Sequence, residues 1–153
     1  MIYCELMEGG LEIKKAHFDD GGFDLFLSEQ LVVRLQTRTY LKIKVLMPMG
    51  WSGRIVPRSS SYDKGVEVNG TLDRYIGEIF LTVKNSTRRS LTFEKGHSIA
   101  QLLPVYTGAG IDMSKPTVKS LYELLTACNE VSVVNALPKT KRGSKGFGST
   151  GNI

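Results

Sequence analysis

Residues 53–85 read GRIVPRSSSYDKGVEVNGTLDRYIGEIFLTVKN, and this stretch decides the fold. Short apolar runs at its two ends, in 51–56 and 76–84, favour β-strands, and so do the valines on either side of Glu67. Asn69-Gly70 is a strong signal for a tight turn between strands. The stretch therefore predicts strands joined by a hairpin turn, with Asp73 three residues after Gly70.

The middle of this stretch concentrates residues that can handle a phosphate chain. Arg58 carries a planar, permanently charged group that can bind two phosphate oxygens at once. Ser59 and Ser60 add hydroxyl and backbone N–H groups, and Lys64 adds a positive charge. Asp73 supplies one carboxylate for a water molecule. Cationic and hydroxyl groups for phosphate, together with one carboxylate, indicate a phosphate-ester hydrolase.

Short strand patterns also occupy much of the remaining chain. They lie in residues 1–15, 25–35, 40–47, 91–93, 99–106 and 131–134. In 40–47, for example, Leu41, Ile43 and Val45 share one face of the strand. Residues 114–130 are the one segment with apolar residues at helical spacing. Many short strands and one helix predict an all-β, mostly antiparallel sandwich or barrel.

The 153 residues predict a single β domain, 1–137, followed by a mobile C-terminal arm, 138–153. The arm is basic, rich in glycine and nearly devoid of core residues. Its glycines allow the backbone to curl around an anion, and Phe147 is a lone ring that can stack on a base. A flexible solvated tail fits the same composition, so both interpretations stay open.

The overall composition is that of an ordinary soluble protein, with 41% apolar and 23% charged residues. No apolar run approaches the ~18 residues that span a membrane, and the acidic N-terminus does not resemble a signal peptide. Cys4 and Cys128 lack metal-ligand spacing, which indicates reduced thiols and argues against zinc. We therefore predict a cytoplasmic protein.

The formal net charge of +5 fits an anionic partner. By itself it does not choose among nucleic acid, nucleotide and membrane surface. The cations are spread along the chain, and the one cluster, Lys139, Lys141, Arg142 and Lys145, favours a solvated tail when charge alone is considered.

Five segments taken together resemble, in order, the five motifs of one enzyme family. They are GGFDLF (21–26), GRIVPRSS (53–60), NGTLDRYIGEI (69–79), GHSIAQLLPV (96–105) and RGSKGFGSTG (142–151). The family is that of the trimeric deoxyuridine triphosphatases (dUTPases), and the resemblance covers residues 19–106 and 137–151. It implies hydrolysis of dUTP to dUMP and pyrophosphate with Mg²⁺, which limits uracil in DNA and supplies dUMP. It also implies a jelly-roll-like fold and no direct contact with nucleic acid or membrane.

The resemblance further implies roles for single residues. Asp73 would be the catalytic carboxylate, which activates the water that attacks the α-phosphate and also bonds the deoxyribose 3′-hydroxyl. Arg58, Ser59 and Ser60 would hold the phosphate chain, and Gln101 would contact the region of the α-phosphate. Such a site works mainly by positioning the phosphates and neutralising their charge.

The nucleoside and the metal would contact other positions. The hairpin around Asn69 and Gly70 would recognise uracil through main-chain groups and leave no room for the methyl group of thymine. Tyr75 would lie under the deoxyribose and exclude a 2′-hydroxyl. Asp24 would hold hydrated Mg²⁺ through a water, in a site of oxygen ligands of the kind that magnesium prefers.

The arm would complete the site. Arg142 would bind the γ-phosphate, and Phe147 would close over the uracil ring, with Gly148, Ser149 and Thr150 nearby. In the family, three subunits form a homotrimer with shared active sites, and the arm of one subunit closes over a site made by the other two. Such closure excludes water and orders the phosphates.

The chain departs from the family pattern in three places. One residue separates Asp73 from Tyr75 where the family usually has two, and Ser98 stands where an arginine is common. The connection 106–136 is longer than usual and carries the predicted helix. We expect this insertion, 112–130, to pack on the outside of the trimer or to extend the path of the arm.

Two other functions compete with dUTP hydrolysis. A dCTP deaminase of the same superfamily needs a glutamate as proton shuttle, and the matching position is Thr82, which cannot serve at neutral pH. Glu78, predicted on the same strand, keeps this alternative open. The second competitor is a nucleotide-sensing regulatory protein that binds a protein partner through residues 112–130.

Overall fold

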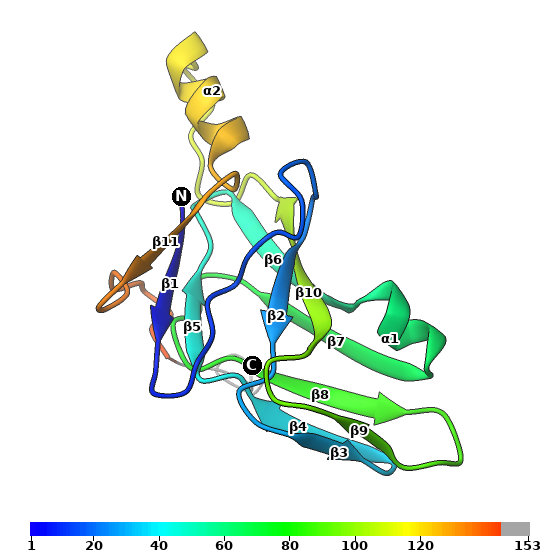
Figure 1. The fold of residues 1–153 in the computed structure, drawn as a ribbon. Helices are drawn as coiled ribbons and strands as arrows, with labels where there is room; N and C mark the ends of the chain where they lie inside the picture. Colours follow the sequence, from blue (N-terminus) through cyan, green and yellow to red (C-terminus); the bar gives the residue numbers. More distant parts are fainter. Residues whose placement is uncertain (145–153) are drawn as a thin grey trace, which may run out of the picture.

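The computed structural model describes residues 1–144, in which three β-sheets carry two helices (Figure 1). The strands are β1 (Ile2–Leu6), β2 (Phe23–Phe26), β3 (Leu31–Val33), β4 (Gln36–Tyr40), β5 (Ile43–Leu46), β6 (Trp51–Pro57), β7 (Val66–Leu72), β8 (Phe80–Asn85), β9 (Leu91–Phe93), β10 (Ser98–Tyr106) and β11 (Val131–Val134). The helices are α1 (Ser59–Asp63) and α2 (Val118–Thr126). The predicted all-β class is confirmed.

The largest sheet has the strand order β2-β10-β6-β7-β8-β4, and the smaller sheets have the orders β11-β1-β5 and β3-β9. Strands β1 and β11 pair in parallel, whereas the other strand pairs in the described chain are antiparallel. The sheets curl around a common core (Figure 1). This is the mostly antiparallel, jelly-roll-like arrangement that the sequence predicts.

Alternation along the strands gives each sheet a core face and an outer face. In β7, Val66, Val68 and Leu72 are buried, whereas Glu67 and Asn69 between them are exposed. A shift of the register by one residue would exchange these two sets of side chains. The burial of the valines therefore fixes which side chains of β7 face outward.

Side chains from all three sheets meet in one core. Ile2, Val33, Ile43, Val83 and Leu102 come from five different strands, and each has 0% of its surface exposed. Burial of a side chain of this size stabilises the fold by about 1.5–3 kcal/mol. The core therefore holds the sheets in the relative positions that bring the predicted site residues together.

Two sequence predictions in the central stretch are wrong. The structure has a second helix, α1, whose single turn is closed by hydrogen bonds from the Ser61 and Tyr62 N–H groups to the Arg58 carbonyl. A single turn is too short to show helical periodicity in a sequence. Asn69-Gly70 lies inside β7 and not in a turn, because β6 and β8 pair with β7 on both sides and these ladders outweigh the turn preference.

Several predicted strand boundaries are also corrected. The first strand ends at Leu6, well before the predicted limit, and the segment predicted as 25–35 overlaps the end of β2 and contains β3. The strand predicted as 76–84 begins at Phe80, so Glu78 lies in the preceding loop. The loop of residues 73–79, here called the Asp73 loop, connects β7 to β8.

Helix α2 lies within the predicted segment 114–130 and projects from the sheets (Figure 1). A reciprocal pair of hydrogen bonds between Thr117 and Ser120 caps its N-terminus. Trp51 Nε1 donates to the Leu124 carbonyl at 3.0 Å and ties the helix to β6. Apolar side chains such as Val118 and Leu125 stay exposed on α2. Its packing in a trimer and its use by a protein partner stay predictions.

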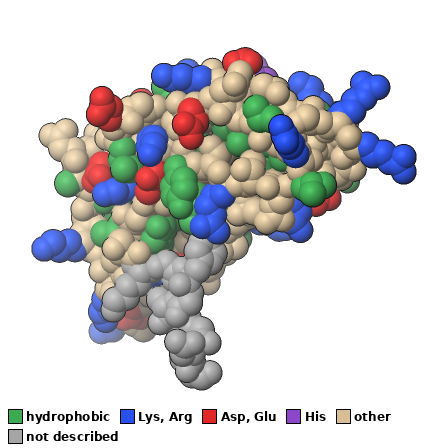
Figure 2. Space-filling view, turned by 90° about the horizontal axis from the view of Figure 1, so that it is seen from below, with side chains coloured by type: hydrophobic (Ala, Val, Ile, Leu, Met, Phe, Trp, Pro, Cys, Tyr) green, Lys and Arg blue, Asp and Glu red, His purple; other side chains and the backbone are tan. Residues whose placement is uncertain are grey.

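Because the Lys and Arg residues are spread along the sequence, we expect their side chains to be spread over the surface as well. On the face drawn in Figure 2, Lys and Arg side chains lie both at the margin and inside the outline, interspersed with acidic and hydrophobic side chains. Among residues 1–144, no helix combines the length and apolar character that crossing a bilayer requires.

Candidate active site

Every predicted site residue within residues 1–144 lines one of two pockets. The Arg58 pocket, of about 460 Å³, is lined by Ala16, Asp20, Gly21, Gly22, Asp24, Arg58, Ser59, Ser60, Gln101 and Leu103. The Asp73 pocket, of about 510 Å³, is lined by Arg54, Ile55, Asn69, Gly70, Thr71, Leu72, Asp73, Tyr75, Glu78, Ile79, Phe80, Thr82 and Arg142. The two pockets share no lining residue. Phe147, Gly148, Ser149 and Thr150 lie outside the described residues.

Three neighbouring strands build the Arg58 pocket. Gln101 in β10 pairs with Asp24 in β2 on one side and with Val56 in β6 on the other. The Arg58 N–H donates to the Ile99 carbonyl at 3.0 Å, which extends the β6–β10 ladder to the start of α1. This register brings together three motifs that are far apart in the sequence.

Arg58 forms an ion pair with Asp24 inside the Arg58 pocket. Arg58 Nε lies 3.3 Å from Asp24 Oδ1, and these side chains are 39% and 16% exposed. Because this ion pair uses Nε, it leaves the two Nη groups of Arg58 as donors for an anion. Gly22 lies against Gln101, since a Cβ at position 22 would be 2.5 Å from Gln101 Oε1. Glycine at this position therefore allows the amide of Gln101 to enter the pocket.

The outward-facing side chains of the largest sheet form the wall of the Asp73 pocket. Arg54 in β6 is opposite Thr71 in β7, and Asn69 in β7 is opposite Thr82 in β8. Asp73 follows directly after β7, and its side chain is 63% exposed. Water therefore reaches the carboxylate of Asp73 in this chain.

Backbone and side-chain hydrogen bonds hold both ends of the Asp73 loop. At the start of the loop, Arg74 Nη1 donates to the Met47 carbonyl at 3.1 Å. At its end, the Leu41 N–H donates to the Ile79 carbonyl, and the Ile79 N–H donates to the Ile43 carbonyl. The loop is therefore anchored to the core between β4 and β5.

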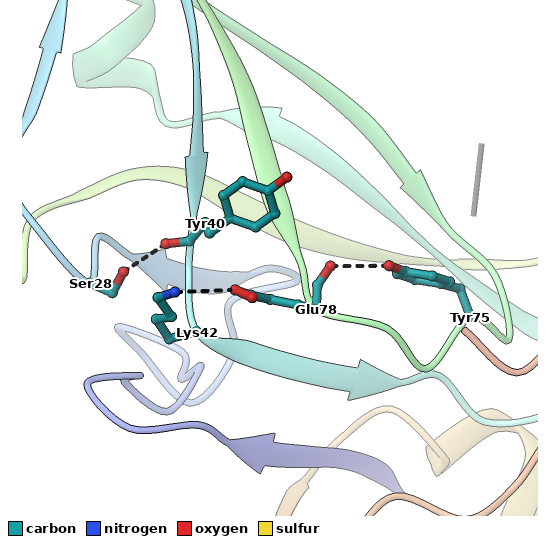
Figure 3. A network of polar contacts seen from close by, with 5 residues as sticks. All are labelled: Ser28, Tyr40, Lys42, Tyr75 and Glu78. Atoms are coloured by element: carbon teal, nitrogen blue, oxygen red, sulfur yellow. Dashed lines mark hydrogen bonds and ion pairs between the residues drawn. The ribbon is translucent and has the colours of Figure 1, made fainter. Parts of the chain in front are cut away.

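Tyr75 has a defined position within this loop. Its hydroxyl donates to the Glu78 carbonyl at 3.2 Å, and its ring packs against the core (Figure 3). Gly77 lies next to the ring, since a Cβ there would be 2.1 Å from the Tyr75 hydroxyl oxygen. The shortened spacing to Asp73 thus still leaves Tyr75 in the same pocket as Asp73.

Glu78 is directed toward Lys42 (Figure 3). Its Oε2 atom is buried without a hydrogen-bond partner and lies 4.0 Å from Lys42 Nζ. Lys42 has a left-handed backbone, with a φ of 59°, a conformation that is uncommon outside glycine. The side chains of Lys42 and Glu78 are 44% and 21% exposed, so the ammonium group compensates the charge near this oxygen only weakly.

Glu5 holds the segment that precedes the arm. Its Oε1 accepts a hydrogen bond from the Leu137 N–H at 2.9 Å, and its Oε2 lies 3.1 Å from Lys44 Nζ. Burial opposes ionisation of Glu5, but the hydrogen bond from Leu137 and the charge of Lys44 outweigh burial and lower the pKa of its carboxyl group. The ionised form of Glu5 thus connects β1 to the start of the arm.

Sequence reasoning missed two residues in the wall of the Asp73 pocket, Arg54 and Thr71. Both flank buried residues in strands, Ile55 and Leu72. Counting alternate positions outward from these apolar residues would have identified them. Ser98, where the family commonly has arginine, is buried, and its hydroxyl donates to the Ala100 carbonyl at 3.0 Å.

Two carboxylates of the Arg58 pocket could bind a magnesium ion. No group of three or more His, Cys, Asp or Glu side chains that could hold a metal occurs in residues 1–144. Asp20 and Asp24 both line the Arg58 pocket and offer the oxygen ligands that magnesium prefers. These residues fit an ion that takes most of its ligands from phosphate and water.

The fold and the two pockets define an all-β protein suited to a phosphorylated ligand. The dUTPase family model matches residues 12–151. The deoxyuridine 5′-triphosphate nucleotidohydrolase of Paramecium bursaria Chlorella virus 1 is 36% identical over 158 aligned positions, which cover 99% of this chain and 97% of that protein. The protein of the same name from Saccharomyces cerevisiae is 29% identical over 136 positions, which cover 86% of this chain and 80% of that protein. The chain belongs to the dUTPase family.

Solved structures agree in fold. A mutant dUTPase from phage phi11 of Staphylococcus aureus has a TM-score of 0.66 at 18% identity, and the match covers 77% of this chain and 99% of that one. The EIAV dUTPase has a TM-score of 0.62 at 23% identity, covering 76% of this chain and 96% of that one. At these identities the likeness shows a common fold.

Proposed function

We propose that this protein hydrolyses dUTP to dUMP and pyrophosphate, with Mg²⁺ as cofactor. One observation carries the proposal. The described positions that match the family motifs line two pockets, one with Arg58 and two serines and the other with Asp73 and Tyr75. Phosphate-binding groups and a solvent-accessible carboxylate are the two parts that water attack on a phosphate chain requires.

In the proposed reaction, the oxygen of a water molecule attacks the α-phosphorus while the bond from that phosphorus to the oxygen bridging to the β-phosphate breaks. The Asp73 carboxylate accepts the proton of the water, and pyrophosphate leaves. Arg58, Ser59 and Ser60 hold the phosphate oxygens, and Gln101 contacts the region of the α-phosphate. Magnesium held by phosphate oxygens, and by Asp24 through a water, would supply charge neutralisation. The mutant phage phi11 dUTPase is described with a coordinated structural Mg(II) ion.

Nucleoside recognition is assigned to the Asp73 pocket. Main-chain groups at Asn69 and Gly70 in β7 are proposed to bind uracil, since both residues line the pocket. The Tyr75 ring, which Gly77 and the Glu78 carbonyl hold in place, is proposed to pack under the deoxyribose and exclude a 2′-hydroxyl. Arg142 in the same pocket would supply positive charge for the γ-phosphate.

We propose a homotrimer with shared active sites. Within one chain the two pockets share no lining residue, so the groups needed for one reaction lie in separate places. In a closed ring of three copies, the Arg58 pocket of one chain can face the Asp73 pocket of its neighbour. Sedimentation analysis should give a trimer, and a monomer that retains full activity would contradict this assembly.

The experiment is pyrophosphate release from dUTP with Mg²⁺, measured for the intact chain and for Asp73→Asn. Loss of the carboxylate should lower the rate by about 10²-fold or more and leave nucleotide binding largely intact. Hydrolysis of dCTP, dTTP and UTP should be slow in comparison. An intact chain that binds dUTP without hydrolysing it would refute the proposal and favour a nucleotide-sensing protein.

The deaminase alternative is tested in parallel by ammonia release from dCTP. Thr82 stands at the position of the shuttle glutamate, and Glu78 lies in the Asp73 loop with a buried oxygen directed toward Lys42. Glu78 lines the Asp73 pocket, but its buried oxygen faces Lys42, and Thr82 cannot carry a proton at neutral pH. We therefore expect no ammonia release, and its detection would support the deaminase.

A further inference from the structure

Arg74 lies where the Asp73 loop is shorter than is usual in the family. It is the single residue between Asp73 and Tyr75. Both sides of this short connection are fixed to the core, because Leu72 is 3% exposed at the end of β7 and the Tyr75 ring packs against the core. Asp73 and Arg74 therefore connect two residues whose positions are fixed.

The side chain of Arg74 reaches an acceptor that is itself held in place. Its Nη1 donates to the Met47 carbonyl at 3.1 Å, and a hydrogen bond from a charged donor is stronger than one between neutral groups. Met47 follows β5 and has 0% of its surface exposed. The next residue is Pro48, whose carbonyl accepts a hydrogen bond from the Trp51 N–H at 3.1 Å and so closes a turn. The guanidinium group of Arg74 thus attaches the loop to a rigid part of the core.

The direction of Arg74 also determines the direction of Asp73. At the end of β7, Thr71 lines the Asp73 pocket and Leu72 is buried, as alternation in a strand requires. Asp73 again lines the pocket, and Arg74 again turns back toward the core, at Met47. Because neighbouring side chains on such a backbone point to opposite sides, the fixed side chain of Arg74 keeps Asp73 facing the pocket.

The carboxylate of Asp73 makes only weak contacts of its own. Its side chain is 63% exposed, and its ion pair with Arg142 is long, at 3.9 Å between Arg142 Nη1 and Asp73 Oδ2. An exposed ion pair of this length does little to fix a side chain. The position of the carboxylate therefore depends mainly on the backbone on either side of it, which the hydrogen bond from Arg74 to Met47 holds.

We infer that Arg74 is a positioning residue for Asp73, and that its hydrogen bond to Met47 compensates for the residue that this loop lacks. The inference rests on the proposed function, in which Asp73 accepts the proton of the attacking water. Arg74 is not among the described residues that line the Asp73 pocket, whereas Asp73 and Tyr75 on either side of it are. Its loss should therefore lower kcat, which depends on the position of Asp73, and leave KM for dUTP nearly unchanged.

The test compares Arg74→Met and Arg74→Lys with the intact chain in pyrophosphate release from dUTP with Mg²⁺. Methionine is also unbranched but cannot donate a hydrogen bond, whereas lysine keeps a charged donor. We expect kcat to fall about 10-fold in the methionine variant and to recover in part in the lysine variant, with KM changed by less than about twofold in both. An active intact chain whose kcat is unchanged by Arg74→Met would overturn this inference and leave the proposed function standing.

A double variant separates the positioning of Asp73 from general support of the fold. If Arg74 acts through Asp73, adding Arg74→Met to Asp73→Asn should lower the remaining rate by less than about twofold, because the group that Arg74 positions is already lost. A loss that adds in full to that of Asp73→Asn would show a structural role and overturn the inference. This comparison holds even if the single variants differ in melting temperature, because both proteins of each pair are assayed below it.

Arg88→Met is the matched control for the loss of one positive charge. Arg88 is exposed in the loop between β8 and β9 and lines neither pocket. Its charge is screened by solvent, so kcat should stay within about twofold of that of the intact chain. Equal losses of kcat in Arg88→Met and Arg74→Met would show an effect of net charge and overturn the inference. A folded intact chain that does not hydrolyse dUTP would overturn the proposed function and this inference together.

Discussion

Replacing Gly77 by alanine should displace Tyr75 and lower both activity and sugar selectivity. A Cβ at position 77 would lie 2.1 Å from the Tyr75 hydroxyl oxygen and 2.2 Å from the ring carbon that carries it. Ordinary van der Waals contact begins at 3.4 Å, so the end of the ring must move by about 1 Å to make room. The backbone of Gly77 does not have a positive φ, so the added methyl group acts through Tyr75.

The expected size of the effect follows from this displacement. Movement of the ring breaks the hydrogen bond from Tyr75 to the Glu78 carbonyl, which is worth about 1 kcal/mol, or about fivefold in an equilibrium constant. A misplacement of about 1 Å in a group that positions the substrate can cost up to about 10²-fold. We therefore expect kcat/KM for dUTP to fall by about 10- to 10²-fold and the preference for dUTP over UTP to weaken.

The assay is pyrophosphate release from dUTP and from UTP, and two further variants separate the causes. Tyr75→Phe removes only the hydroxyl and should cost about fivefold. In Tyr75→Ala the ring is absent, so adding Gly77→Ala to it should cause little further loss. Wild-type kinetics for Gly77→Ala, or a penalty that adds in full to that of Tyr75→Ala, would refute the reasoning.

Three further predictions concern stability and reactivity. Asn85→Ala removes a buried amide that makes four hydrogen bonds, to Val33 in β3 and to Thr87 and Arg89 after β8. The free energy of unfolding in urea should therefore fall by about 3–5 kcal/mol, whereas the exposed Asn129→Ala should change it by less than about 0.5 kcal/mol. The fold lowers the pKa of Glu5, so ionised Glu5 stabilises the protein above its unfolded-state pKa, and this stabilisation is lost as the pH falls through the folded pKa. Glu5→Gln should therefore weaken the pH dependence of the free energy of unfolding in urea between neutral and acidic pH. An unchanged pH dependence would contradict this. Burial raises the pKa of the Cys4 and Cys128 thiols to about 11. Mass spectrometry should therefore find no iodoacetamide adduct at pH 8 until denaturant is added. Rapid labelling of the native protein would show that these thiols are accessible and would contradict the prediction.

The sequence predicts a shared site for Asp24, Arg58 and Gln101, but it does not predict how they are arranged. Their roles follow from the resemblance of the motifs, in order, to those of the dUTPase family, and not from the residue types alone. Their proximity depends on the pairing of β10 with β2 and β6, which joins segments far apart in the sequence. Local patterns predict that strands form, whereas the choice of partner strand depends on how the whole core packs.

The errors in the central stretch have a related cause. Asn69-Gly70 has the strongest local preference for a turn, yet pairing on both sides keeps it within β7. Helix α1 follows directly after β6 and is closed by two hydrogen bonds to the Arg58 carbonyl, which no periodic pattern records. The separation of Asp73 from Arg58 into two pockets is likewise a property of the folded chain and not of sequence spacing.

The parallel pairing of β1 with β11 also has a consequence for biosynthesis. Ile2 and Cys4 are fully buried, and the Ile2 N–H donates to the Glu130 carbonyl. The first strand to leave the ribosome can pair early with β5, but its other edge has no partner until β11 emerges at the end of the domain. Contacts between such distant segments slow folding, and an unpaired strand edge favours aggregation. We therefore expect chains that end before Val131 to aggregate, because β1 would then keep one edge without a partner strand. Stable folding of the N-terminal strand thus depends on synthesis of β11.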